Sequence, residues 1–409
     1  MASWDRKIWE RIRDYFISTQ SAIRVKGVNT TQFSEDLVAE RTPVIELNSS
    51  YGTSLIRDNI TTTNGGTIEP AEGVLRLSVT GDPDSRSLLE SSEIGRYVPG
   101  YGAQIGVGIR CNCTPEGDSE VRWGGWDAEQ ENGFYFGVDS LGKFVAIKRA
   151  NTVSKVYQQD WNIDKLDGSG QSRLDLNPEL GFIYQIEFSW YGYGQILFGV
   201  TGVDESTNQQ RFIPCHSLRR FDETSVLTPN LRIFVDVVNS GDGNTYQVDV
   251  GGRQYSIVGK YEPIVRVNGD WRDTTSVGTT TQPLISLRQK EDFLSRSIKA
   301  RGFDIVDVTE SIIAEIRVGG DLTDGSWENL SNQIPEETSL EVNKSATEVI
   351  GGTIIWTGII GAEGPGSNRE SASIDTDVDV PEGKVITLCA RAFTGTSSTR
   401  SAFRVTEEW

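Results

Sequence analysis

The stretch IEFSWYGYGQILFG, residues 186–199, decides the fold of this chain. On both sides of a glycine-bearing turn, apolar residues recur at every second position, namely Ile186, Phe188, Trp190, Ile196 and Phe198. A period of two is typical of a strand with one buried face. Gly192 and Gly194 let the chain reverse. The stretch therefore predicts an antiparallel hairpin with a core row that includes Trp190, and with Tyr191 and Tyr193 at its tip.

The same period continues along much of the chain. From about residue 40, runs such as GVLRLSVTG, GFYFGVDS and YQIEFSW alternate in polarity, and turn signals such as Asn132-Gly133 separate them. Short strands without intervening helices favour an all-β antiparallel sandwich or jelly roll. In LRIFVDVV, residues 231–238, the odd positions form an apolar row. The other face carries Phe234 and Val238, so we expect that face to be covered as well.

The length of 409 residues favours more than one domain. We expect an N-terminal arm over residues 1–25 and a jelly-roll domain over residues 26–262. The polar, Thr-rich stretch GDWRDTTSVGTTTQP predicts a linker or long loop over residues 263–285. Further alternating runs predict a second, smaller β-rich domain over residues 286–409.

The N-terminal arm carries a helical pattern. Within residues 3–19, large apolar side chains recur at three- and four-residue spacing and form one stripe, which consists of Ile8, Trp9, Ile12, Tyr15 and Phe16. A helix with such a stripe must bury it. Two alternatives stay open: the stripe packs on its own domain, or it anchors the chain to a partner.

Charge and hydropathy exclude several classes of function. The chain has 58 acidic and 39 basic residues, a formal net charge of −19, which disfavours binding to nucleic acid or to an anionic membrane. No run of about 18 apolar residues occurs. The start, MASWDRKIWERIRDYF, lacks the apolar region of a signal peptide. We expect synthesis in a cytoplasm, with no membrane and no nucleic acid as partner.

The reactive residues give little support to catalysis. Cys111 and Cys113 are two positions apart in a predicted strand, and we expect them not to pair with each other. We expect all four cysteines, with Cys215 and Cys389, to be buried free thiols in a reducing compartment. His216 is the one histidine in the sequence, and it follows Cys215 directly. Adjacent residues on a strand face opposite ways, so Cys215 and His216 are not a ready nucleophile–base pair. We expect no catalytic residue, no cofactor and no metal ion.

Two acidic features offer alternatives to that expectation. Asp127, Glu129 and Glu131 in WDAEQENGF would share one face of a strand, and paired carboxylates are what glycoside hydrolysis requires. Laminarinase-type hydrolases place acids at this spacing, but as Glu-x-Asp-x-Glu, whereas this chain has Asp-x-Glu-x-Glu. The loop acids Asp82, Asp84 and Asp242 offer oxygen ligands of the kind that calcium takes.

Exposed aromatic residues beside polar loops are the usual means by which a lectin-like sandwich binds sugars. Four residues meet that description in the sequence, and we take as candidates for glycan binding Trp123, Trp126, Tyr191 and Tyr193.

Residues 130–245 resemble a group of tailed-phage structural proteins that have a concanavalin A/laminin-G-like jelly roll. The resemblance rests on NGFYFGVDSLGKFVAIKR, then YQIEFSWYGYGQILFGV, then CHSLRRFDETSVLTPNLRIFVDVVNSG, in that order. It covers about the first 260 residues. These motifs identify a fold and not a catalytic centre.

The resemblance implies a component of a virion exterior, either a head decoration or fibre or a tail or baseplate accessory protein. Other virion proteins, in the capsid or tail, would then be its partners, met through the N-terminal arm, and the protein would be made in the host cytoplasm. Such proteins are present in many copies, so we expect a homo-oligomer, with a trimer favoured. The alternatives are a host-adsorption protein that binds a surface glycan and, more remotely, a glycoside hydrolase.

Overall fold

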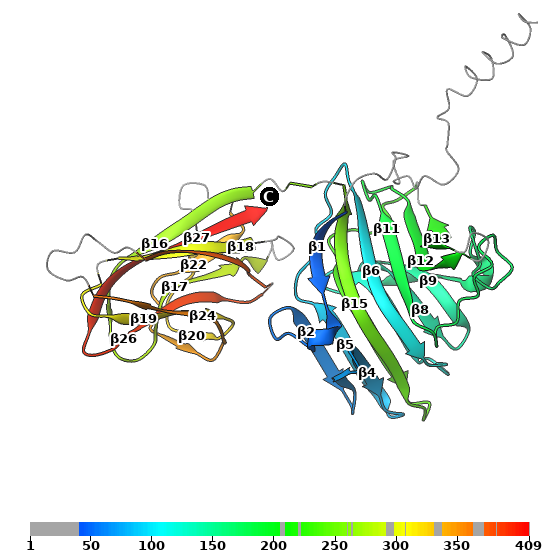
Figure 1. The fold of residues 1–409 in the computed structure, drawn as a ribbon, viewed down its shortest axis with the longest axis horizontal. Helices are drawn as coiled ribbons and strands as arrows, with labels where there is room; N and C mark the ends of the chain where they lie inside the picture. The colour runs from blue at the N-terminus through cyan, green and yellow to red at the C-terminus, as the bar shows by residue number, and fades with distance from the viewer. Residues whose placement is uncertain are drawn as a thin grey trace, which may run out of the picture.

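The computed structural model describes residues 41–204, 209–219, 222–259, 261–262, 265–291, 298–306, 308–330, 338–362, 372–381 and 383–408. Its described part is all-β, with two short 3₁₀ turns, η1 (Ser49–Tyr51) and η2 (Gln158–Asp160), and no α-helix. Figure 1 shows two separate β-bodies. Each has its own hydrophobic core.

The first body is a sandwich of two antiparallel sheets. One has eight strands in the order β13 (Gln209–Leu218), β12 (Ile196–Asp204), β11 (Phe182–Phe188), β6 (Gly102–Asn112), β15 (Tyr246–Val258), β4 (Val74–Val79) and β3 (Thr67–Ala71), with β1 (Arg41–Leu47) also paired to β15. The other has seven in the order β10 (Thr152–Tyr157), β9 (Gly142–Arg149), β8 (Gly133–Asp139), β7 (Glu120–Trp126), β14 (Arg232–Ser240), β5 (Pro83–Ser91) and β2 (Asp58–Thr63).

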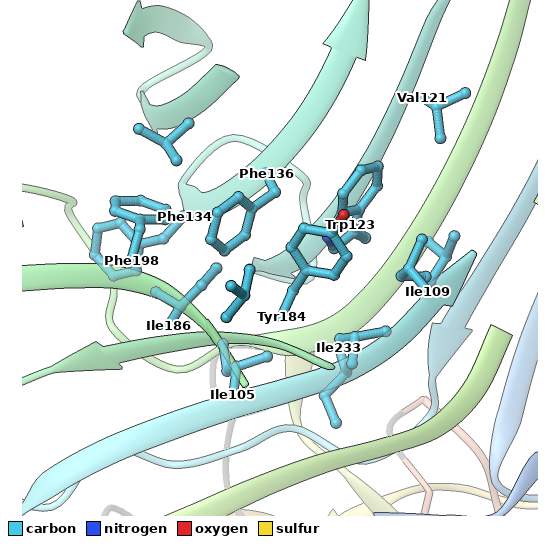
Figure 2. Close-up of a cluster of buried hydrophobic side chains, with 14 of the residues drawn as sticks. Ile105, Ile109, Val121, Trp123, Phe134, Phe136, Tyr184, Ile186, Phe198 and Ile233 are labelled. Carbon is cyan, nitrogen blue, oxygen red and sulfur yellow. The ribbon is translucent and has the colours of Figure 1, made fainter. Parts of the chain in front are cut away.

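The core lies between these sheets, as Figure 2 shows for side chains from β6, β7, β8, β11, β12 and β14. Trp123 lies at its centre, with the Tyr184 ring edge-on at 4.8 Å and the Phe136 ring stacked at 6.4 Å. The apolar row predicted in LRIFVDVV is buried here through Leu231, Ile233, Val235 and Val237. Apolar area removed from water is the main stabilising term for such a core.

The hairpin predicted from residues 186–199 is confirmed. β11 and β12 pair antiparallel, and their core row is fully buried at Ile186, Phe188, Ile196 and Phe198. Trp190 is half-buried against the core and donates its Nε1–H to the Val226 carbonyl at 3.3 Å. A strand with one buried face leaves its opposite row to solvent, but on that row Gln185 and Ser189 are only 5% and 6% exposed.

The second body is also a sandwich. One sheet has the order β16 (Val265–Val277), β27 (Ser397–Glu408), β18 (Ile298–Val306) and β25 (Ala372–Asp379). The other has the order β21 (Glu328–Asn329), β22 (Leu340–Asn343), β17 (Gln282–Gln289), β26 (Ile386–Ala392), β19 (Ile312–Val318) and β24 (Thr353–Ile360), and β20 (Asp321–Thr323) pairs with β23 (Glu348–Ile350).

The predicted linker over residues 263–285 is wrong. Residues 265–277 form β16, which pairs with β27 along most of its length, and Gln282 already begins β17. Threonine is polar, but its β-branched side chain suits a strand. The Thr-rich composition was therefore compatible with an edge strand as well as with a loop.

The amphipathic stripe of Ile8, Trp9, Ile12, Tyr15 and Phe16 lies outside the described residues. Within the described residues, no helix is long and apolar enough to cross a membrane.

The turn between β11 and β12 generates a stability prediction. A Cβ on residue 194 would lie 1.3 Å from the Ser189 carbonyl oxygen. Gly194→Ala must therefore displace backbone, and we expect it to lower the free energy of unfolding by about 1–3 kcal/mol in urea titrations. Gly181→Ala, before the same hairpin, meets nothing within 4 Å and serves as the control. Equal unfolding midpoints for both variants would contradict the close approach.

Candidate functional site

Several loops meet at the end of the sandwich where β11 passes into β12. The turn of residues 189–195 closes on itself, since the Gly194 amide donates to the Trp190 carbonyl at 2.6 Å. It is tied to a second loop, because the Ser225 amide donates to the Gly192 carbonyl at 3.0 Å. These bonds fix the backbone that carries Tyr191 and Tyr193.

Tyr191 and Tyr193 are each 55% exposed, as their place at the tip predicted. Tyr191 has a φ of +38°, a conformation that bulky residues rarely adopt and that marks local strain. Its ring lies edge-on to Tyr97 at 6.4 Å, and Tyr97 stacks on the core residue Phe188 at 6.1 Å. The Tyr191 ring therefore rests on an aromatic chain that reaches the core.

Tyr97 lies between the tyrosine turn and the core. It is 5% exposed, and burial raises the pKa of its hydroxyl. Its amide donates to the Asn230 side chain at 3.0 Å, and Gly95 nearby pairs with Leu231. No sequence pattern pointed to Tyr97, because its role depends on contacts with distant loops.

The two tryptophans predicted to bind glycan are not available to a ligand. Trp123 is 2% exposed and belongs to the sandwich core, and Trp126 is 1% exposed. Trp126 points to the outer face of the seven-stranded sheet, where its ring stacks on Phe234 at 3.4 Å. β7 is a central strand with both faces covered, and period two alone does not reveal this.

The outer face of the seven-stranded sheet carries a layer of buried side chains, namely Leu88, Trp126, Tyr135, Phe144, Ala146 and Phe234. Phe234 was expected to be covered, and this layer covers it. Charged residues lie over the layer: the Arg122 guanidinium is 5.7 Å from the Trp126 ring centroid, and the Lys155 ammonium 4.3 Å from that of Phe144.

Ion pairs join those charged residues across the sheet. Asp236 is fully buried and pairs with Arg122 and, at 2.7 Å, with Arg86. Lys155 pairs with Glu120 at 3.2 Å and with Asp139 at 2.8 Å. Burial alone would raise the pKa of Asp139, but hydrogen bonds from Lys155 and others bring it below its ordinary value. The outer face is thus closed by paired charges.

The predicted carboxylate face of Asp127, Glu129 and Glu131 does not form. β7 ends at Trp126, and residues 127–132 make a turn in which Gln130 has a φ of +58°. Asp127 is buried and accepts hydrogen bonds from the amides of Glu131 and Asn132, while Glu129 is exposed. The acids are therefore not aligned on a strand. The turn that Asn132-Gly133 signals already begins at residue 127, so all three acids lie in the turn.

The cysteines follow the prediction in part. Cys215 and Cys389 are buried free thiols, and burial raises the pKa of Cys389 to about 12. Cys111 and Cys113, expected to stay apart, are joined by a disulfide, with Cα atoms 5.3 Å apart. Residues two apart on a strand share one face, and Cα atoms in an extended strand would lie roughly 6.6 Å apart. β6 ends at Asn112, and the chain there brings the two cysteines closer than an extended strand would.

His216 and the loop acids have structural partners. His216 is 4% exposed, burial lowers its pKa, and its Nδ1 accepts the Asn162 amide at 3.2 Å. Asp242 accepts hydrogen bonds from Ser119 and Tyr246. Among the described residues, no group of three or more His, Cys, Asp or Glu side chains is arranged to hold a metal ion.

Two adjoining hollows, of about 260 and 410 Å³, lie on the outer face of the eight-stranded sheet. No sequence pattern predicted them. Arg110 and Asp249 line both. The lining residues come from strands far apart in the sequence, so only the register of the sheet brings them together.

No protein-family model and no curated protein matches this sequence. Among solved structures, the chain is similar to Bacillus licheniformis β-glucanase, with 11% identity, 53% of this chain and 98% of that chain covered, and a TM-score of 0.34. Peanut lectin is 11% identical, with 54% of this chain and 98% of that chain covered and a TM-score of 0.32. The Emp47p carbohydrate recognition domain is 14% identical, with 53% of this chain and 96% of that chain covered and a TM-score of 0.32. These neighbours are lectin-like jelly-roll and glucanase domains. Likeness at this level concerns the fold alone and says nothing about function.

The buried carboxyl of Glu90 generates a pH prediction. Glu90 is 6% exposed, and burial raises its pKa although Trp126 Nε1–H donates to it at 2.5 Å. Because the folded pKa lies above the unfolded value of about 4.3, ionisation of Glu90 destabilises the fold as pH rises. Glu90→Gln keeps the acceptor and removes the charge, so we expect a higher Tm than wild type at pH 7.

That difference in Tm should shrink as the pH falls to about 4, where the wild-type carboxyl is increasingly protonated in both states. Scanning calorimetry at several pH values measures it. The exposed Glu129→Gln is the matched control and should leave Tm unchanged. A Glu90→Gln variant less stable than wild type at pH 7 would refute the account.

Proposed function

We propose that this chain is a non-catalytic carbohydrate-binding protein, and that it binds glycan through Tyr191 and Tyr193. The observation that carries the proposal is a pair of half-exposed tyrosines on a turn fixed by hydrogen bonds. Aromatic rings stack on the apolar faces of sugars, and their hydroxyls add hydrogen bonds. A turn ordered before binding loses little entropy on binding.

The non-catalytic part of the proposal is supported by the acidic residues. Asp127 is used to hold its own turn, and Glu129 and Glu131 project from that turn instead of lining one strand face. Polysaccharide cleavage that is lost on substitution of Glu129 and Glu131 would contradict it.

Substitution of the tyrosines tests the binding proposal. Each ring should contribute about 0.5–1.5 kcal/mol of stacking, so Tyr191→Ala and Tyr193→Ala should each weaken binding of an array-selected glycan by about 2- to 12-fold. Isothermal titration calorimetry measures the change. Tyr51→Ala removes a tyrosine that is 89% exposed elsewhere and is the control. No glycan bound at millimolar concentration, or equal loss in all three variants, would overturn the proposal.

The setting that we propose is the exterior of a phage particle, which the sequence resemblance over residues 130–245 supports. In that setting the stripe of Ile8, Trp9, Ile12, Tyr15 and Phe16 attaches the protein to other virion proteins, and the protein is a homo-oligomer. Sugar binding by the sandwich would then serve host adsorption.

Deletion of residues 1–20 tests the attachment. We expect the truncated protein to fold and to keep its affinity for glycan, because the sandwich has its own core, but to be lost from purified particles. Quantitative mass spectrometry of particles measures incorporation. Normal incorporation of the truncated protein would contradict the anchoring role of the arm.

A further inference from the structure

The two hollows on the outer face of the eight-stranded sheet form one groove across four neighbouring strands, β11, β6, β15 and β4. They share Arg110 and Asp249, so one runs into the other. The larger hollow, of about 410 Å³, lies within the range of small-molecule sites. The groove lies beside Phe182, at the opposite end of β11 from the tyrosine turn, about 20 Å of extended chain away.

A cross-strand triad builds the polar end of the groove. Asp249 pairs in register with Arg76 on one side and Arg110 on the other. Arg76 donates Nε–H and Nη2–H to the two carboxylate oxygens at 2.8 and 3.1 Å, and Arg110 donates Nε–H at 3.1 Å. Burial alone would raise the pKa of Asp249, but the two guanidiniums bring it below its ordinary value. The triad is therefore a fixed, charged wall.

Three more polar side chains surround the triad: Asn112, Glu179 and Gln247. None of them has a side-chain hydrogen bond to the rest of the described chain, and all are exposed to the groove's solvent. Asn112 lies between the disulfide-bonded Cys111 and Cys113, which restrains its backbone. The polar end thus offers both donors and acceptors to a ligand.

Glycine makes the floor of the other end. Ile183 pairs with Gly108, and beyond Gly108 lies Gly251, where the pairing of β15 with β6 shifts register. A Cβ on Gly251 would touch only Gly108, at 3.7 Å or more. Side chains are therefore missing where they would otherwise fill the face. The adjoining wall is apolar, with Ile183 43% exposed beside Phe182.

The charges of the groove favour a neutral ligand. Around the polar end, the positive charges of Arg76 and Arg110 are balanced by the negative charges of Asp249 and Glu179. Glu72 adds a further acid to the larger hollow, in a chain with a net charge of −19. An anion would find no net attraction here.

We propose that this groove is a second saccharide site, which binds a neutral oligosaccharide with its hydroxyls on the Arg76–Asp249–Arg110 triad and a C–H face over Gly108 and Gly251. The presence of the groove and the near balance of its charges do not depend on the proposed function. The choice of a sugar among neutral hydroxylated ligands rests on the proposed function. Two separate sites on one chain would let it hold two parts of a branched or extended glycan.

Calorimetry with the full chain tests the second site, using cellobiose, lactose and maltose as neutral probes and glucuronic acid as the anionic comparison. Gly251→Val should fill the floor, and Gln247→Ala should remove an exposed hydrogen-bonding group. We expect each to weaken binding of a neutral probe about fivefold or more. Gly252→Val, at a position with open space and no part in the groove, is the matched control.

The Tyr191→Ala, Tyr193→Ala double variant separates this inference from the proposed function. It should lose binding of the array-selected glycan and keep binding of the neutral probes in the groove. If it keeps wild-type affinity for the array-selected glycan while Gly251→Val loses the neutral probes, the groove stands and the tyrosine site falls. The groove proposal is overturned if none of the neutral probes binds at millimolar concentration, if Gly251→Val and Gln247→Ala leave binding unchanged, or if glucuronic acid alone binds.

Discussion

The sandwich depends on the double burial of its seven-stranded sheet. One face of β7 and β14 packs into the core through Trp123 and the Leu231–Val237 row. The other is covered by the aromatic layer and by the ion pairs around Asp236. A fully buried carboxylate is tolerated only because two guanidiniums compensate its lost hydration, and removal of either guanidinium would leave that compensation incomplete. Both faces of this sheet therefore serve to stabilise the fold.

The eight-stranded sheet is different because its outer face is only partly filled. That face buries polar side chains such as Gln185 and Ser189, but around the groove it carries glycines at positions 108 and 251, where the seven-stranded sheet carries aromatic rings. Where side chains are missing, the backbone is exposed and hollows result. The same fold thus has one closed outer face and one that is partly open, and the difference follows from which residues occupy the outward positions.

The sequence predicted what depends on local pattern. Period two located the strands, and the core row of the hairpin of residues 186–199 followed from it. The same pattern placed Tyr191 and Tyr193 at an exposed tip. Alternation failed where both faces are apolar, because it then cannot tell an exposed tryptophan from a covered one. Trp126 is the clearest case, since its cover comes from Phe234, more than a hundred residues away.

The remaining errors have a similar cause. The Thr-rich stretch before residue 285 was predicted as a loop because its pairing partner, β27, lies far along the sequence. Cys111 and Cys113 share one face of a strand, and they pair because β6 ends between them and the chain brings them closer than an extended strand would. Tyr97 and the Arg76–Asp249–Arg110 triad gave no sequence signal at all, because each is assembled by contacts over more than a hundred residues.

The two proposed sites, the tyrosine turn and the groove, would give a sandwich specificity without a deep cleft. At the tyrosine turn, a strained backbone is held by a hydrogen bond to a second loop, so the backbone that carries the exposed rings is fixed. In the groove, Asp249 holds two arginines in register, so their remaining N–H donors point in fixed directions. In both places the rigid part is buried or paired, and the exposed part has few internal partners. Recognition at the two proposed sites would then cost little ordering, and its selectivity would be set by the spacing of strands and loops that the core maintains.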